Sequence, residues 1–205
     1  MEYTDLIASL PNVERAAGVL LETMSLEELG IYGIPTMGIA GGSWLLDDYE
    51  FTSGAAFLID SQRPQSDTAV VDPAVKSSAE QRPILLGAHL AERIDVQVGS
   101  EVSLFDEAYQ VVGIFKSPSV WENGSMILPL SSLQLLTDRS GQVTYINVVL
   151  KGGISGDTAA EVVQSIEAVD RKLLPLATTE FVESDTRMQL ARGMAWMTSM
   201  VAILI

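Results

Sequence analysis

His89 is the only side chain in the 205-residue sequence that could act as an imidazole base or metal ligand. One histidine cannot build a histidine-based metal site, and no cysteine is present to complete one. A Ser-His-Asp site would have to use His89, because the sequence has no other histidine. No Gly-x-Ser-x-Gly sequence occurs. His89 follows Gly87 by two residues and falls on the first turn of a predicted helix. We therefore expect His89 to be a plain surface residue.

Two glycine-containing segments carry fragments of nucleotide-binding patterns. The segment Gly38-Ile39-Ala40-Gly41-Gly42 lacks the Gly-Lys-Ser/Thr ending of a P-loop, and Ser43 does not open a predicted helix. Gly87 stands between a predicted strand and a predicted helix, as the first Rossmann glycine does, but the second and third glycines are missing. Neither segment indicates a cofactor.

Two pairs of neighbouring acids, Asp47-Asp48 and Asp106-Glu107, are candidates for cation binding. A calcium site needs further oxygen ligands at regular spacing, and no Asp-x-Asp-x-Asp-Gly pattern occurs. We expect these acids to be solvated turn residues. The sequence therefore predicts no catalytic residue, no cofactor-binding residue and no metal ligand.

Trp121 is the residue most suited to bind a partner protein. It lies between Pro118 and Asn123 in a predicted exposed loop, and large aromatic residues often anchor interfaces. A second interpretation places Trp121 across the core of the neighbouring hairpin. Trp44 is another candidate for an apolar binding patch.

The charge of the chain disfavours two classes of partner. Twelve basic and 27 acidic residues give a formal net charge of -15, which disfavours nucleic acid and anionic lipid surfaces. Hydrophobic residues make up 47% of the chain, which favours a folded domain over disorder. The absence of cysteine fits an extracytoplasmic domain but also fits many cytosolic proteins.

Hydrophobic periodicity predicts short strands that alternate with short helices, which is typical of an α+β fold. A predicted hairpin pairs the strand with Val102 and Leu104 with the segment 109–115. Gly113 lies at a bend within that second strand. Residues 25–37 and 60–82 are predicted to be irregular, apart from a short edge strand at 69–71. The expected strands are 13–24, 44–46, 57–59, 84–86, 102–104, 109–115, 126–128, 143–150 and 176–182. The expected helices are 3–10, 87–94, one carrying Leu133 and Leu136 with Ser131 or Ser132 as its cap, one after Thr158 that ends at Pro175, and 183–192.

The uncharged C-terminal run Gly-Met-Ala-Trp-Met-Thr-Ser-Met-Val-Ala-Ile-Leu-Ile, residues 193–205, follows Arg187 and Arg192. It is shorter than the roughly 20 apolar residues of a membrane-spanning helix. We expect residues 186–205 to be the start of a truncated transmembrane helix. The alternative is a C-terminal helix that belongs to the core.

The sequence between residues 86 and 136 resembles the periplasmic core domain of MacB-type, FtsX-like ABC transporter permeases. That family has an "LG…A..L…VGD.V.L…..VVGIF" pattern, and Ser100-Glu101 stands here where Gly-Asp is usual. The residues that carry the resemblance are Leu86-Gly87, Leu90-Ala91, Val98-Gly99, Val102, Leu104, Val111-Val112-Gly113-Ile114-Phe115, Pro129-Leu130 and Leu133 to Leu136. The opening segment 6–13 and the segment after Met188 resemble the two membrane edges of that domain.

The resemblance implies a split fold. Residues 1–50 and 141–185 would form a membrane-proximal, porter-like α/β subdomain, residues 51–140 an inserted small α/β subdomain with the hairpin, and residues 186–205 the membrane helix. It also implies a domain without enzymatic activity, on the outer side of a bacterial inner membrane and anchored there by flanking transmembrane helices.

The implied function is to transmit ATP-driven conformational change to substrate export or release. The implied partners are a cytoplasmic ABC ATPase and a second copy of the permease, and nucleic acid is not among them. The alternative function is an FtsX-like ectodomain that binds and regulates a periplasmic partner such as a cell-wall hydrolase.

Overall fold

The computed structural model describes residues 2–57, 82–152 and 156–176. The chain divides into two compact units. Unit 1 contains the described residues of the ranges 1–4 and 17–147, and unit 2 contains Asp5–Ala16 and the described residues from Val148 onward. The subdomain boundaries expected at 50/51 and 140/141 stay predictions. The division into units is a different one, since residues 17–26 of β1 and all of β2 belong to unit 1.

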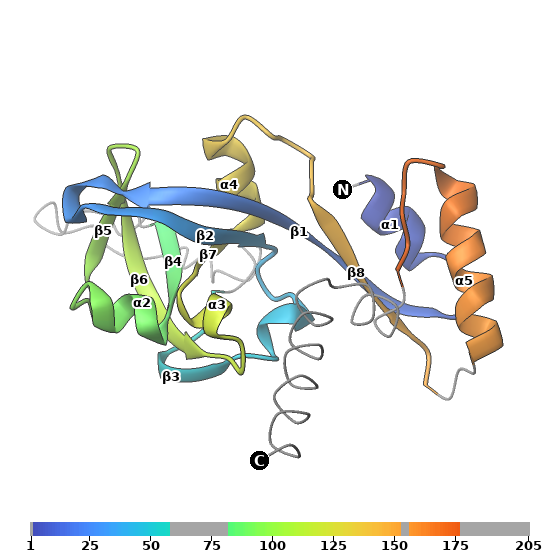
Figure 1. Cartoon of the computed structure of the whole chain (residues 1–205), viewed down its shortest axis with the longest axis horizontal. Coiled ribbons are helices and arrows are strands. Elements are labelled where there is room, and N and C mark those ends of the chain that lie inside the picture. Colours follow the sequence, from blue (N-terminus) through green and yellow to red (C-terminus); the bar gives the residue numbers. More distant parts are fainter. Residues whose placement is uncertain (1, 58–81, 153–155, 177–205) are drawn as a thin grey trace, which may run out of the picture. The chain divides into compact units, whose positions relative to one another are not determined.

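The fold mixes helices and strands, which confirms the predicted α+β class (Figure 1). The helices are α1 (Glu2–Ala8), η1 (Glu27–Leu29), η2 (Trp44–Leu46), α2 (Ala88–Arg93), α3 (Val120–Asn123), α4 (Leu130–Leu136) and α5 (Gly156–Val169). The strands are β1 (Val13–Leu26), β2 (Ile31–Ile39), β3 (Glu50–Gly54), β4 (Arg82–Gly87), β5 (Glu101–Leu104), β6 (Glu107–Lys116), β7 (Met126–Pro129) and β8 (Tyr145–Leu150).

The described strands form one sheet in the order β3-β6-β4-β7-β2-β1-β8, and β5 pairs with β6 outside this path. Two antiparallel pairs are hairpins of consecutive strands, β1 with β2 and β5 with β6. The sheet also contains parallel pairs, β2 with β7 and β4 with β6. The β5–β6 hairpin was predicted from its alternating sequence and is confirmed.

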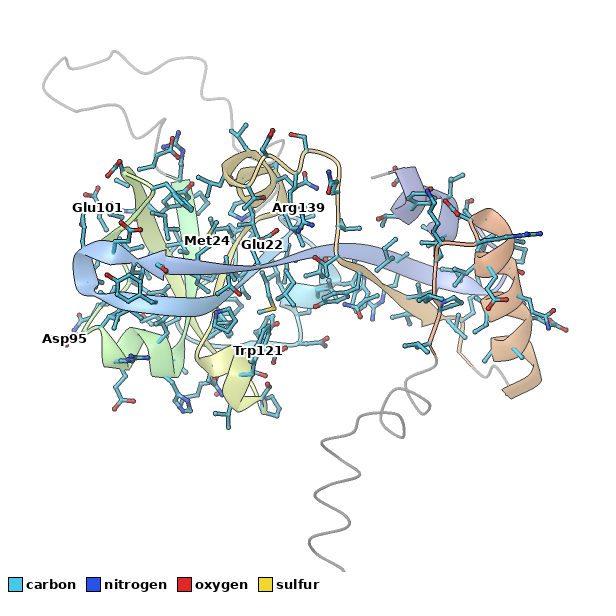
Figure 2. The ribbon with its side chains drawn as sticks, turned by 45° about the horizontal axis from the view of Figure 1, so that its top comes forward. Glu22, Met24, Asp95, Glu101, Trp121 and Arg139 are labelled. Carbon is cyan, nitrogen blue, oxygen red and sulfur yellow. The ribbon has the colours of Figure 1, made fainter. Side chains whose placement is uncertain are left out.

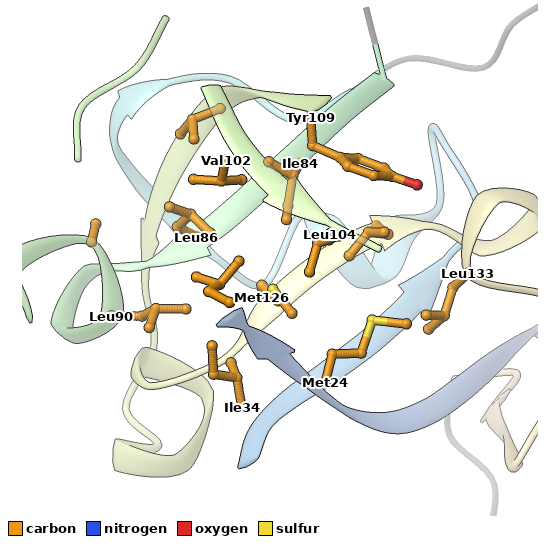
Figure 3. Packing of buried hydrophobic residues seen from close by; sticks show 14 of the residues in the cluster. Met24, Ile34, Ile84, Leu86, Leu90, Val102, Leu104, Tyr109, Met126 and Leu133 are labelled. Atoms are coloured by element: carbon orange, nitrogen blue, oxygen red, sulfur yellow. The ribbon is translucent and has the colours of Figure 1, made fainter. Parts of the chain in front are cut away.

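Both faces of the sheet are covered in unit 1. Successive residues of a strand point to opposite faces, and on β4 Ile84 and Leu86 enter one core cluster while Leu85 enters another. All three side chains are fully buried, which explains why this strand is a continuous apolar run. Figure 3 shows how Ile84, Leu86 and Met126 pack in the first cluster. The same cluster contains Leu90 of α2 and Leu133 of α4.

A bulge in β6 changes which face its side chains occupy. Ile84 pairs with Val111, but the next residue, Leu85, pairs with Gly113, so Val112 has no opposite residue on β4. An extra residue of this kind shifts the alternation of the strand. Val111 and Phe115 are four residues apart and would face the same side of a regular strand, yet they lie in different clusters.

Unit 2 is smaller. Its buried apolar side chains are Ile7 of α1, Val13 of β1, and Val162 and Ile166 of α5. The spacing of four between the two α5 residues places them on one face of the helix, as the sequence pattern predicted. No helix within the described ranges is long and apolar enough to cross a membrane.

Two sequence predictions about the first 50 residues are wrong. Residues 25–37 are regular rather than irregular. Gly30, in the turn of a β1–β2 hairpin, and Gly33, within β2 where the pairing shifts register, adopt φ angles of 65° and 73°. Residues 44–46 form the 3-10 helix η2 rather than a strand, and its first turn is capped by Ser43, whose hydroxyl accepts from the N–H of Leu45 at 3.3 Å.

Further local predictions are also wrong. Helix α4 begins at Leu130 after Pro129, so neither Ser131 nor Ser132 caps it. Helix α5 begins before Thr158 and ends at Val169, well before Pro175. Phe57 is buried but lies outside any strand, and the unpredicted β3 precedes it. The predictions for 58–59, 60–81, 177–182, 183–192 and 186–205 fall outside the described residues.

Candidate functional site

The sequence candidates for chemistry lie apart from one another. His89 is exposed on the first turn of α2, as predicted. Gly38 lies in β2, where an added Cβ would come within 3.0 Å of Leu133 Cδ2, so this glycine permits α4 to pack on the strand. Gly87 lies at the N-cap of α2 with the carbonyl oxygen of Asn123 2.4 Å from the position of a Cβ. Close packing therefore explains both glycines.

Three of the four paired acids lie in turns, and Glu107 begins β6. Asp47 and Asp48 are exposed after η2, and Asp106 is exposed in the β5–β6 turn. Glu107 pairs with Arg82 at 3.1 Å. Within the described part of the chain, no three acidic or histidine side chains gather as ligands for a metal ion.

Trp121 lies on the short helix α3 (Figure 2). It is 47% exposed, and its neighbour Val120 is 76% exposed. The interpretation that places Trp121 across the hairpin core is therefore wrong, and its binding of a partner stays a prediction. The segment 116–124, predicted to be a loop, contains α3 because Ser119 caps it by accepting from the N–H of Glu122 at 3.3 Å.

A cavity of about 390 Å³ lies in unit 1 beside α3. Elements far apart in the sequence contribute to its wall, from β1 and β2 to η2, α3 and β8. Three aromatic rings and two acids take part. The lining residues are Val19, Met37, Ile39, Trp44, Leu45, Asp48, Tyr49, Ser117, Pro118, Glu122, Tyr145 and Asn147.

Glu122 is the polar centre of this cavity. The hydroxyl of Tyr49 donates to Glu122 Oε1 at 3.3 Å, and the hydroxyl of Ser117 donates to Glu122 Oε2. The ring of Tyr49 in turn packs on Phe115 with 4.6 Å between ring centroids. Two hydroxyl donors therefore hold the carboxylate in place, and the ring that carries one of them packs against the core cluster that contains Leu85 and Phe115.

Asn123 fixes the loop that borders the cavity. Its amide nitrogen donates to the carbonyl oxygens of Ser117 at 2.6 Å and Ser119 at 2.9 Å, and its Oδ1 accepts from the N–H of Ser117 at 3.0 Å. The side chain is buried, so these hydrogen bonds are shielded from water.

Two tyrosine hydroxyls of the cavity remain protonated. Burial, followed by the nearby Glu122 carboxylate, raises the pKa of Tyr49 above its ordinary value. Burial and Glu122 also raise the pKa of Tyr145. Both hydroxyls are therefore neutral donors at physiological pH, and the cavity has a negative charge at its carboxylates.

Sequence reasoning missed this constellation. Trp44 was noted as an aromatic candidate, but Tyr49 and Glu122 were not, and they are 73 residues apart. No spacing motif links residues that distant. The cavity forms because β2 pairs with β7 and the α3 segment precedes β7, a long-range arrangement that local patterns do not contain.

Comparison with protein families shows to which family the chain belongs. The model of the MacB-like periplasmic core domain matches residues 1–169. The chain belongs to this family. This match confirms the resemblance found in the segment 86–136 and makes the chain the extracytoplasmic domain of a MacB-like ABC transporter permease. Permeases of this type work with ATPase subunits.

Solved structures show that the MacB-like domain shares its fold with other transporter regions. The periplasmic region of MacB from Actinobacillus actinomycetemcomitans has a TM-score of 0.57 at 11% identity, with 82% of this chain and 72% of that chain covered. The extracellular domain of the noncanonic ABC-type transporter YknZ from Gram-positive bacteria has a TM-score of 0.51 at 13% identity, with 82% of each chain covered.

A third solved structure is a domain of a putative permease protein from Porphyromonas gingivalis, with a TM-score of 0.50 at 22% identity, covering 80% of this chain and 74% of that chain. At such identities the likeness concerns the fold alone. The three proteins are described as transporter or permease regions and not as enzymes. Among curated proteins, no significant match to this chain was found.

Proposed function

We propose that this domain transmits ATP-driven conformational change from a cytoplasmic ABC ATPase to substrate export or release on the outer side of the membrane. In this proposal two copies of the permease act together, and flanking transmembrane helices anchor each domain. The residues 1–50 and 141–185 are proposed to lie nearest the membrane. The domain itself performs no catalysis and binds no nucleic acid.

The observation that supports this proposal is the way the chain passes between its two units. The passage at Thr4–Asp5 falls inside α1. The passage at Ala16–Ala17 falls inside β1, and the passage at Asn147–Val148 falls inside β8. Flexible Gly- and Ser-rich linkers take up displacement, whereas an extended strand has a fixed rise per residue. Two extended strands rather than flexible linkers therefore join the units, which supports the proposal that a displacement is transmitted.

Distance measurements by spin labelling test the proposal in the whole permease. This chain has no cysteine, so a label at Glu101→Cys in unit 1 or Gln164→Cys in unit 2 is unique once cysteines outside the chain are replaced. Both positions are exposed. We expect the distance between the two copies to change at both positions when ATP is trapped. A change at Gln164 without a change at Glu101, or no measurable pair of copies, would overturn the proposal.

A linker insertion makes the test specific. Gly-Gly-Ser placed between Asn147 and Val148 interrupts β8 at the passage between units. We expect it to abolish the ATP-dependent change at Glu101 while leaving the change at Gln164. The matched control is the same insertion after Gly152, a turn residue inside unit 2. If both insertions have the same effect, transmission does not depend on the strand.

A second candidate function is suggested by the exposed apolar side chains of α3. Val120 and Trp121 are adjacent, and both are exposed, as in a surface that docks a periplasmic partner such as a cell-wall hydrolase. A photo-crosslinking amino acid in place of Trp121 should capture such a partner in cells. Leu135, 77% exposed on α4, is the control position. Equal products at both positions would count against a partner site on α3.

A further inference from the structure

The residues that line the cavity beside α3 are of the types that bind a cation with an alkyl chain. Trp44, Tyr49 and Tyr145 contribute aromatic rings, and the thioether of Met37 and the side chain of Ile39 add apolar surface. The face of an aromatic ring attracts cations, and groups of such rings recognise alkylated ammonium ions. The volume of 390 Å³ lies within the range of about 300 to 1,000 Å³ that small-molecule sites occupy.

The charges at this cavity have one sign. Asp48 and Glu122 are the charged residues among those that line it, and both are acidic. The two tyrosine hydroxyls are neutral, because burial and then the Glu122 carboxylate raise the pKa of each. An anionic ligand is therefore disfavoured here by Coulomb repulsion, and a cationic one is attracted.

Glu122 retains the capacity to bind a cation. A carboxylate offers about four lone-pair positions. One donor on each oxygen, Tyr49 on Oε1 and Ser117 on Oε2, leaves about two of these positions for N–H donors of a ligand. Since the two hydroxyls hold the carboxylate in place, an ammonium group that enters the cavity loses little free energy to reorganisation of the site.

We propose that this cavity binds an alkylammonium ion, with its charged nitrogen at Glu122 and its alkyl chain against the ring of Trp44 and the apolar wall. This proposal goes beyond the proposed function and does not depend on coupling to ATP. The same chemistry is presented by a free amine and by a lysine side chain, and the two sources are separated by the probes used below.

Calorimetric titration of the full 205-residue chain tests the proposal with three probes. Hexylammonium chloride represents a free amine, Nα-acetyl-lysine methylamide represents a lysine side chain, and 1-hexanol is the neutral control of similar length. We expect hexylammonium to bind, its affinity to fall with added salt, and hexanol to bind at least about tenfold more weakly. Binding of the lysine probe alone would retain the ammonium site and assign it to a protein side chain. Equal binding of hexanol and hexylammonium, or binding of neither ammonium probe, would overturn the proposal of an alkylammonium site.

Two neighbouring acids provide matched variants. Asp48 lines the cavity and Asp47 does not, although both are exposed and each change to Asn removes one negative charge. We expect Asp48→Asn to weaken hexylammonium binding about threefold and Asp47→Asn to leave it unchanged. Glu122→Gln should weaken it by about tenfold or more. If Glu122→Gln fails to fold, the comparison of Asp48→Asn with Asp47→Asn still tests the proposal. Equal losses of hexylammonium affinity in these two variants would show a general effect of net charge and would overturn the site.

Discussion

Gly113 of β6 lies directly against Leu85 of β4. A Cβ at position 113 would be 2.9 Å from Leu85 Cδ2, 2.7 Å from the carbonyl oxygen of Ala55 and 3.1 Å from Phe51 Cδ1. The contact occurs where β6 carries its bulge and where Gly54 of β3 pairs with Gly113. Glycine is therefore required at this position for β6 to fit between β3 and β4.

Replacement of Gly113 by Val should destabilise the domain. The two added methyl groups and the Cβ must displace both a backbone carbonyl and a buried leucine, which costs about 3 kcal/mol in a packed core. Gly113→Ala should give a smaller loss of the same sign. The control is Gly124→Ala, because a Cβ there meets its nearest atom at an ordinary 3.6 Å. Urea unfolding of the three variants measures the effect, and an unchanged midpoint for Gly113→Val would contradict the β6 geometry.

A buried glutamine fixes the segment after α4. The side-chain nitrogen of Gln134 donates to the carbonyl oxygen of Gln142 at 2.7 Å, and Gln134 is 7% exposed. Gln134→Ala should lower the free energy of unfolding by about 1 to 3 kcal/mol, because it removes a buried hydrogen bond. Gln142→Ala keeps the backbone acceptor and should have little effect. If the two variants are equally destabilised in thermal unfolding, the hydrogen bond is not the cause.

The sequence predicts elements whose local pattern agrees with their surroundings. The run Ile84-Leu85-Leu86 predicts a buried strand because both faces of β4 are covered, and the alternation at Val102 and Leu104 predicts β5 because only one face enters the core. The β1–β2 hairpin was missed because Gly30, Gly33 and Pro35 are locally unfavourable for a strand.

Tertiary pairing resolves that local conflict. Strand β2 has β1 on one side and, from Thr36 onward, β7 on the other, and Thr36 pairs with Met126 far along the chain. Pro35 lies just before this parallel pairing begins, where its missing N–H is not needed by β7. The same long-range pairing places Glu122 near Tyr49, so the cavity could not be predicted from any single segment.

Tyr109 should make stability depend on alkaline pH. Burial, and then the Glu107 carboxylate, raise the pKa of Tyr109 from 10.0 to about 12, while the Arg82 guanidinium opposes this shift. Because the folded-state pKa is the higher one, the stabilisation is fully present below pH 10 and is lost as pH rises through 12. Tyr109→Phe should make the decline of stability above pH 10 shallower.

Spectrophotometric titration of the tyrosines separates the causes. Glu107→Gln removes a negative charge near the phenol, whose hydroxyl donates to Glu107 Oε2 at 3.4 Å, and should lower the pKa of Tyr109. Arg82→Gln removes the opposing cation, whose guanidinium lies 6.0 Å from the ring centroid, and should raise it. Shifts of the same sign in both variants would contradict the charge assignment.

A substitution in the turn between β5 and β6 should stabilise the domain. Leu104 pairs with Glu107, so Phe105 and Asp106 form a two-residue loop, with φ angles of 49° and 62°. Such loops favour Asn-Gly, because a large side chain in the left-handed region is strained. Phe105 is 66% exposed and loses little packing when replaced. Phe105→Asn should therefore raise the free energy of unfolding by about 1 kcal/mol, and the β-branched Phe105→Val should lower it. Urea unfolding of both variants checks the pair, and a loss of stability in Phe105→Asn would mean that the ring contributes contacts that outweigh its backbone strain.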